Sequence, residues 1–210
     1  PNLTETFEPR GLLIEEARTN LATKSHLVGH PDGNGDWQRD GTMGSTPSNP
    51  NYTSPMGTTS DLRTIIETGN TSAHTVYHNS VPLGSTAKCT TVFIKPLRTD
   101  RDLQLRAVGI GGGAPWVNYD LNTGIMTNYA GTSGTSAAGR SWTMSTPFIE
   151  EYPNGWYRVG FVNLSVSQAH GQSGWIFGIY VVPKGQSAEA NNFAGTHQDV
   201  FSAWGAQYED

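Results

Sequence analysis

The stretch from residue 154 to residue 165 constrains the fold of this chain more than any other. It begins with an Asn-Gly dipeptide, which favours a tight turn because both residue types tolerate positive φ. The residues that follow have the β-branched and aromatic content of a strand. Side chains alternate between the two faces of a strand, so one set is predicted to face a core and the other an outer surface. The core set is Tyr157, Val159 and Phe161, and the outer set is Trp156, Arg158 and Gly160. A sheet with one dry face and one aromatic, polar face is a common way to build a binding surface.

Short segments of the same character recur along the chain, separated by turn-forming residues. They comprise residues 62–67, 75–82, 88–95, 103–108, 116–120, 125–128, 142–148, 157–165, 176–182 and 200–208. No window longer than about ten residues keeps a helical period. Many short strands joined by Gly-rich turns are typical of a sandwich or barrel. We therefore predict an all-β fold, a β-sandwich of two antiparallel sheets with almost no helix.

Two further residues are predicted to be buried. Trp204 shares one face of the last segment with Ala206 and Tyr208 if that strand is regular, and we expect this face to contact the core. Cys89 is the only cysteine, which excludes an internal disulfide. It lies in an apolar strand pattern, so we expect it to be buried and chemically inert.

The length of 210 residues, without an internal repeat or a charged linker, favours one domain over residues 11–210. We expect residues 1–10 to form an arm or linker, and long loops near residues 26–55 and 182–198. The chain begins with Pro1 rather than Met, so we expect a fragment of a longer protein or a processed product.

The net charge of -5 argues against nucleic acid as a partner, because nucleic acid selects basic patches. No apolar run approaches the ~20 residues of a membrane span, so we expect no membrane insertion.

Strand phase predicts one candidate ligand surface. If the aliphatic residues of segments 88–95 and 103–108 face the core, five other side chains can gather on the opposite face of the sheet. They are Lys95, Gln104, Arg106, Trp156 and Arg158. Aromatic rings stack on the C–H faces of sugars, and Arg and Gln side chains bind adjacent hydroxyls, so this face suits a saccharide. The alternatives are a solvated sheet face and a face buried against a neighbouring subunit.

A second group of candidate ligand residues consists of aromatic side chains beside Gly-rich turns. They are Trp116, Tyr119, Tyr129 and Trp175. An exposed ring at the mouth of a loop is a plausible platform for a sugar. The alternative is that Trp116 and Tyr119 begin a core strand.

Metal and catalytic motifs are weak in this chain. Asp32, Asn34 and Asp36 have the oxygen spacing that opens a calcium loop, but Trp37 and Met43 occupy the positions of the required Gly and Glu. A turn without metal is therefore favoured, and no cofactor is required.

The sequence contains no H-E-x-x-H zinc motif and no G-x-S-x-G nucleophile motif. The adjacent carboxylates at residues 15–16 and 150–151 would point to opposite faces of a strand, so neither pair makes a glycosidase couple. We therefore predict no catalytic residue and no enzymatic activity.

Several segments together resemble one family. They are Gly-Leu-Leu-Ile-Glu at residues 11–15, which we expect to form a short apolar strand, Ala-Arg-Thr-Asn-Leu at 17–21, a Pro-Met-Gly-Thr turn at 55–58, Asp-Leu-Asn-Thr-Gly at 120–124, Asn-Gly-Trp-Tyr-Arg at 154–158 and Trp-Gly-Ala-Gln at 204–207. In order and spacing they are similar to the jelly-roll domains of phage tail and tail-fibre proteins, which resemble carbohydrate-binding modules. The long segments near residues 26–55 and 182–198 depart from the family pattern. Loops are where recognition varies on a constant scaffold.

The resemblance implies a jelly-roll β-sandwich in a virion, extracellular after release from the host. Its expected partners are host surface polysaccharide and other tail or spike proteins, with a homotrimer as the assembly of the full-length protein. A structural calcium is possible by analogy, with Glu15, Glu16 or Asp199 as ligands. The first hypothesis is a non-catalytic receptor-binding module. The second is a structural assembly domain whose aromatic face is buried against other subunits, and the third is a polysaccharide depolymerase.

Overall fold

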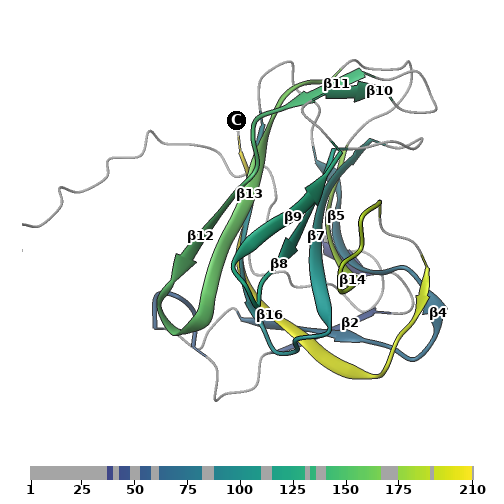
Figure 1. Cartoon of the computed structure of the whole chain (residues 1–210), viewed down its shortest axis with the longest axis vertical. Helices are drawn as coiled ribbons and strands as arrows, with labels where there is room; N and C mark the ends of the chain where they lie inside the picture. Colours follow the sequence, from purple (N-terminus) through teal and green to yellow (C-terminus); the bar gives the residue numbers. More distant parts are fainter. Residues whose placement is uncertain are drawn as a thin grey trace, which may run out of the picture.

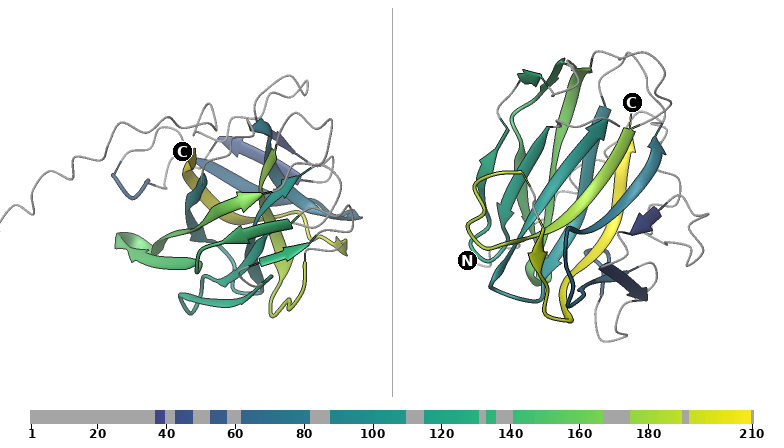
Figure 2. Two further views of the ribbon diagram at one scale, coloured as in Figure 1. Left: turned by 90° about the horizontal axis from the view of Figure 1, so that it is seen from above. Right: turned by 90° about the vertical axis from the view of Figure 1, so that its right-hand side faces the viewer.

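The described part of the chain is almost entirely β-strand. The computed structural model describes residues 37–39, 43–47, 53–57, 62–81, 88–109, 115–130, 133–135, 141–166, 175–189 and 192–209. Within these ranges the one helical element is a 3-10 turn, η1, at Pro153–Gly155. Figure 1 shows the strands and their labels, and Figure 2 shows the long strands running side by side along the molecule. The predicted all-β fold is confirmed.

The strands form two large antiparallel sheets and one small pair. The six-stranded sheet has the order β1 (Trp37–Arg39), β5 (His74–Val81), β14 (Trp175–Pro183), β7 (Arg101–Gly109), β8 (Trp116–Asp120) and β9 (Ile125–Tyr129). The eight-stranded sheet has the order β10 (Ser133–Thr135), β11 (Ser141–Met144), β13 (Trp156–Val166), β6 (Lys88–Pro96), β16 (Gln198–Glu209), β3 (Arg63–Glu67) and β2 (Met43–Pro47), and β12 (Phe148–Tyr152) also pairs with β13. The small pair is β4 (Thr71–Ser72) with β15 (Phe193–Ala194).

The main core lies between the two large sheets, which pack face to face. Fully buried members from the six-stranded sheet include Leu103, Leu105, Val117, Phe177 and Ile179. Those from the eight-stranded sheet include Ile65, Val92, Ile94, Val159, Phe161 and Phe201. Alternate residues of β6, β7, β13 and β14 contribute to this layer, as the period of a strand requires. Burial of this apolar surface is the main source of stability.

The predicted strand segments in the described ranges all form strands, and the structure adds two short strands, β4 and β10, that were not predicted. Segment 142–148 contains most of β11 but only the first residue of β12, so the rest of β12 was not predicted. β1 and β2 lie within residues 26–55, where we expected a loop, and the short strand β15 lies within residues 182–198. Cys89 was predicted to be buried but is only half-buried. The strand expected at residues 11–15 lies outside the described residues.

The Asn-Gly dipeptide forms the predicted tight turn between β12 and β13. Asn154 has φ 64° and ψ 27°, and Gly155 has φ 75°. Both residues therefore adopt the left-handed conformation that Asn and Gly tolerate best. The turn places Tyr152 opposite Trp156 across the hairpin.

A β-bulge in β16 overturns the prediction that Trp204 is a core residue. The register of β16 against β6 shifts between Trp204 and Gln207, and Gly205 has φ 58°. Ala203 and Ala206 both contact the main core, whereas Trp204 packs in a separate cluster on the outer face. The extra residue of the bulge therefore reverses the alternation on which the prediction rested.

We predict that Gly205→Ala lowers the free energy of unfolding by about 1–2 kcal/mol, because a left-handed φ costs a residue with a Cβ roughly that amount. A Cβ at this position would lie 3.5 Å from the Phe93 ring, an ordinary contact, so the loss should come from the backbone alone. Gly205→Asn is the matched control, because Asn tolerates this region better. Chemical denaturation of the three proteins measures the difference, and equal stability of the Ala and Asn variants would contradict the prediction.

Candidate functional site

The outer surface of the eight-stranded sheet carries a cluster of aromatic side chains. Phe93 on β6, Tyr152 on β12, Trp156 on β13 and Trp204 on β16 pack together with Leu62. We call these four rings the aromatic face. Strand pairing explains why they meet: Phe93 lies opposite Trp204 on one side, and Tyr152 lies opposite Trp156 in the β12–β13 hairpin. Figure 1 shows this hairpin at the left edge of the molecule.

Two rings of the aromatic face are buried and two remain partly exposed. The centroid of the Phe93 ring lies 5.0 Å from that of Tyr152 and 5.4 Å from that of Trp204, with interplanar angles of 88° and 61°. Aromatic rings favour such edge-to-face geometry. Phe93 is 8% exposed and Trp156 is 0% exposed, whereas Tyr152 and Trp204 keep part of their surface in solvent. The buried rings therefore hold the exposed rings in fixed positions.

A short segment before β3 binds the indole of Trp156. The Trp156 Nε1–H donates to the carbonyl of Thr53 at 2.9 Å. The segment then turns at Ser54–Gly57, where the Gly57 amide donates to the Ser54 carbonyl at 2.9 Å. Met56 in this turn is 65% exposed. The indole thus has a satisfied polar atom, as a buried tryptophan requires, and an exposed apolar side chain lies on the segment that binds it.

Two cations lie on the same face of the sheet. Arg158 is two residues from Trp156 on β13, and its guanidinium lies 5.8 Å from the centroid of the Phe148 ring and 3.8 Å from a carboxylate oxygen of Glu150. Its side chain is 31% exposed. Lys95 is two residues from Phe93 on β6, and its stem passes close to Gly155 in the Asn-Gly turn. The surface therefore combines exposed aromatic rings with positive charge.

The structure brings together three residues of the predicted ligand surface and separates two others from them. Lys95, Trp156 and Arg158 share the outer face of the eight-stranded sheet. Gln104 and Arg106 lie on β7 in the other sheet, so the expectation of one common surface is wrong. The alternation of each strand was correct. The error came from assigning strands that are distant in sequence to the same sheet.

Trp156 and Tyr119 are both less accessible than predicted. Trp156 is fully buried, so it supports the exposed rings and does not itself offer a surface. For Tyr119 the sequence left open a loop mouth or a core strand, and the structure shows the core strand: Tyr119 is 0% exposed and its hydroxyl donates to the Gly160 carbonyl of the opposite sheet at 3.0 Å. Burial raises the pKa of the Tyr119 phenol. Trp116 is half-buried at the start of β8, and Trp175 begins β14 with its backbone paired to Gly109 and Val81.

Gln104 and Arg106 bind a segment of the chain itself. Residues 184–189, which we call the strap, follow β14 and cross the outer face of the six-stranded sheet. The side-chain amide of Gln104 donates to the Ala188 carbonyl at 3.0 Å, and Gln104 is 0% exposed. The Arg106 guanidinium pairs with Glu189 and lies 4.7 Å from the centroid of the Tyr180 ring. The predicted ligand-binding groups of this sheet therefore already have protein partners.

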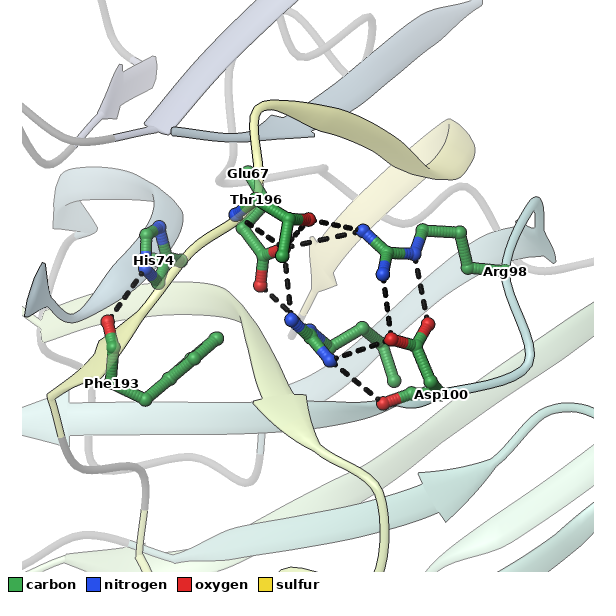
Figure 3. Close-up of polar contacts among 7 residues, drawn as sticks. Glu67, His74, Arg98, Asp100, Phe193 and Thr196 are labelled. Carbon is green, nitrogen blue, oxygen red and sulfur yellow. Dashed lines mark hydrogen bonds and ion pairs between the residues drawn. The ribbon is translucent and has the colours of Figure 1, made fainter. Parts of the chain in front are cut away.

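An ion network fastens three distant segments at one end of the molecule. Figure 3 shows the Glu67 carboxylate facing Arg98 and Thr196. Glu67 accepts from Arg101 at 2.7 and 3.1 Å and from the Thr196 amide at 3.0 Å, and Asp100 binds both arginines. Burial would raise the pKa of Glu67, but the hydrogen bonds from Arg101 and Thr196 outweigh it and lower the pKa. The charges are mutually satisfied, so we interpret the network as structural.

A smaller charged cluster anchors the start of the strap. The Lys184 ammonium lies 2.6 Å from Asp120 and 3.7 Å from Asp102, whose other carboxylate oxygen accepts from the Gly185 amide at 2.8 Å. Burial raises the pKa of Asp102. Burial would also raise the pKa of Asp120, but hydrogen bonds from Lys184, Thr123 and the Asn122 amide lower it to about 2. The hydrogen bond to Asp120 raises the pKa of Lys184.

The predicted metal residues Asp32, Asn34 and Asp36 lie outside the described residues, as do Glu15 and Glu16. Asp199 is exposed on β16. Within the described ranges, no group of three or more His, Cys, Asp or Glu side chains is arranged to hold a metal ion. In the same part of the chain, no helix has the length and apolar character to cross a membrane.

Sequence reasoning missed several members of the aromatic face. Tyr152 ends β12, of which only Phe148 lay in a predicted segment, and Phe93 and Trp204 were not included among the ligand residues. One signal was present: Tyr152 and Trp156 flank the Asn-Gly turn, so a hairpin there places the two rings side by side. Nothing local indicated that Trp204, about 50 residues further along the sequence, would join them.

No protein-family model matches the chain, and no curated protein matches it significantly. The functional argument therefore rests on the site and on the sequence motifs.

We predict that Trp156→Ala lowers the free energy of unfolding by about 3–5 kcal/mol, because it empties a fully buried aromatic site. Trp204→Ala should cost only about 1–2 kcal/mol, because Trp204 is partly exposed. Urea denaturation of both variants against the unmodified protein measures the two losses. A larger loss for Trp204→Ala would show that the roles of the two rings are reversed.

We predict that Lys184→Met destabilises the protein at neutral pH by about 1–2 kcal/mol, after allowance for solvent screening of the exposed ammonium. The pKa of Asp120 lies below its ordinary value of 3.8, at about 2. The ionised Asp120 carboxylate therefore stabilises the fold fully above pH 4–5, and this stabilisation is lost as the pH falls toward 2. The difference in the free energy of unfolding between Lys184→Met and the unmodified protein should therefore shrink as the pH falls over this interval. Denaturation at a series of pH values measures it. Lys95→Met, a charge removal on the other sheet, is the control, and a difference that stays constant down to pH 2 would refute this role of Asp120.

Proposed function

We propose that this protein is a non-catalytic carbohydrate-binding module that attaches a phage or phage-like particle to host surface polysaccharide. The observation that carries the proposal is the aromatic face, where buried Phe93 and Trp156 hold the partly exposed rings of Tyr152 and Trp204. Saccharides offer apolar C–H faces to such rings. A rigid pair of rings binds without first having to be ordered, which lowers the entropic cost of association.

The polar groups beside the rings suit sugar hydroxyls and acidic substituents. Lys95 and Arg158 lie within two residues of the buried rings on the same face of the sheet. Both carry donors only, so they complement hydroxyl or carboxylate oxygens. Glu150, close to Arg158, adds acceptors for hydroxyl protons. This combination of stacking surface and hydrogen-bonding groups is typical of saccharide sites.

The finer description of the fold as a jelly roll is part of the proposal. The strand order supports it. β5, β6 and β7 alternate between the two large sheets, and so do β13, β14 and β16. The central orders β13-β6-β16-β3 and β5-β14-β7-β8 match those of two interlocked Greek keys. Carbohydrate-binding modules and virion proteins commonly use this architecture, and fold alone does not establish the ligand.

The assignment to a phage particle rests on the sequence motifs that resemble tail-fibre domains. The Asn-Gly-Trp-Tyr-Arg and Trp-Gly-Ala-Gln motifs both contribute to the aromatic face, through Trp156 and Trp204. A shallow sheet face binds a sugar weakly, because hydrogen bonds to water are exchanged for hydrogen bonds to protein with little net gain. A homotrimer, as expected for tail fibres, would compensate by linking several sites, which raises avidity by ~10²–10⁴.

One observation favours a second function, in which this surface is an assembly contact with other tail or spike proteins. Met56 is 65% exposed on the segment that binds the Trp156 indole. Flexible methionine side chains suit protein contacts more than they suit sugars. Under this alternative, Tyr152, Trp204 and Met56 become buried between subunits.

We predict that Tyr152→Ala and Trp204→Ala each weaken binding to the recognised glycan about 10-fold or more, as expected when an aromatic anchor is removed. Glycan-array screening of the unmodified chain identifies the ligand, and calorimetry then compares the variants. Ile125→Ala is the matched control, because Ile125 is an exposed apolar residue, 53% accessible, on the edge strand of the other sheet. Arg158→Ala should weaken binding only for an acidic glycan, in a salt-dependent manner.

The oligomeric state distinguishes the two functions. A glycan-binding module keeps its affinity per site when it is monomeric and gains avidity when fused to a trimerisation segment. An assembly contact instead self-associates or binds another tail protein, and Met56→Ser weakens that association in sedimentation experiments. Absence of glycan binding, together with such association, would replace the first function by the second. Release of reducing sugar would establish a depolymerase.

A further inference from the structure

The strap is bound to the six-stranded sheet through its backbone. The side-chain amides of Asn118, Asn128 and Gln104 donate to three consecutive carbonyls, those of Gln186 at 2.6 Å, Ser187 at 2.8 Å and Ala188 at 3.0 Å. The donors come from β8, β9 and β7, which are adjacent in the sheet. We call them the donor row. Gln104 also donates to the Asn118 side chain at 2.6 Å, which fixes the orientation of both amides.

A charged contact continues the donor row at its end. Glu189 follows directly after the three bound carbonyls, and its carboxylate pairs with Arg106. The Arg106 guanidinium lies over the Tyr180 ring, so its position is fixed from two sides. Charge-assisted hydrogen bonds of this kind are stronger than those between neutral groups. The sheet therefore recognises three peptide carbonyls followed by one acidic side chain.

The strap contributes little apolar burial to the fold. Lys184, Gly185, Ser187 and Ala188 are exposed, and Gln186 and Glu189 are half-buried. Because no strap side chain is fully buried, opening the strap exposes polar groups that water can satisfy. Segments with few buried apolar contacts are those that open locally at low free energy. By contrast, Gln104 and Asn118 below it are fully buried in a fixed arrangement. A fixed donor surface is thus covered by a segment that polar contacts hold, with little apolar burial.

We propose that the donor row and Arg106 form a second binding site, for an acidic peptide segment of a partner protein, and that the strap occupies this site in the free protein. The contacts recognise main-chain carbonyls and one carboxylate, which are the features of an acidic peptide. The donor row binds the main chain of residues 186–188, and Arg106 binds only the Glu189 side chain. A peptide of different sequence with a suitably placed Asp or Glu can therefore make the same contacts. The partner must compete with a segment tethered at high effective concentration, so apparent affinity depends on the open fraction.

The experiment uses the full chain with residues 186–189 replaced by a longer Gly/Ser segment, which lowers the effective concentration of the strap and removes Glu189. The probe is a fluorescent peptide with the sequence of residues 184–189, followed by anisotropy. We expect the peptide to bind this variant at least ~10-fold more tightly than it binds the unmodified chain. Glu189→Gln in the peptide, or Arg106→Gln in the protein, should weaken binding about 10-fold, whereas Arg63→Gln on β3 of the other sheet should have no effect.

Failure of the peptide to bind a folded Gly/Ser variant would overturn the proposal, and so would binding that is insensitive to Arg106→Gln. Binding of a neutral oligosaccharide in place of the peptide would overturn the assignment of the ligand. If the variant does not fold, hydrogen exchange on the unmodified chain provides the test. We expect the hydrogen-bonded amides of Gly185 and Gln186 to exchange through local opening, at least ~100-fold faster than those of β14. Equal protection of the strap and β14 would show that the strap is a permanent part of the fold.

Discussion

The face-to-face packing of the two large sheets is the constraint on which every other feature depends, and Tyr119 shows it directly. Its ring crosses the core from β8, and its hydroxyl donates to the Gly160 carbonyl on β13 at 3.0 Å. Gly160 has no space for a side chain, because a Cβ would lie 2.3 Å from the Thr90 carbonyl oxygen. That contact lies within the eight-stranded sheet, since Thr90 is on the neighbouring strand β6, so the link between the sheets is the Tyr119 hydroxyl on the Gly160 main-chain carbonyl. This layer fixes which side chains of each strand remain for the outer faces.

Much of the fold could be predicted from the sequence, because strand position and strand phase are local properties. The inward alternation of Val159 and Phe161, and the Asn154-Gly155 turn, both followed from residue type. Sheet membership could not be predicted, because Arg106 and Arg158 have similar local patterns and only long-range pairing places them in different sheets. The position of Trp204 was missed for another reason. A single bulge at Gly205 reverses the alternation, and glycine also occurs at many ordinary turns of this chain.

The two outer faces are covered by different kinds of interaction. On the eight-stranded sheet, aromatic rings pack against one another, and the Thr53 carbonyl satisfies the Trp156 indole, about 100 residues away in the sequence. On the six-stranded sheet, amide and guanidinium groups bind the strap through carbonyls and a carboxylate. The packing of the aromatic face is stable because disrupting it exposes rings to water. The contacts of the strap are exchangeable, because water or another chain can make the same hydrogen bonds.

This difference determines what each face can offer to a partner. The aromatic face is ready to bind, since its exposed rings are held by buried ones and no segment has to move. Its affinity is then limited by the small area of Tyr152 and Trp204 that remains accessible, which favours repeated weak contacts over one tight contact. The donor row is matched to a peptide but occupied, so its affinity is limited by the free energy of opening the strap. The two proposals thus assign reversible adhesion to one outer face and a protein partner to the other, and their different kinds of cover are the physical reason for that division.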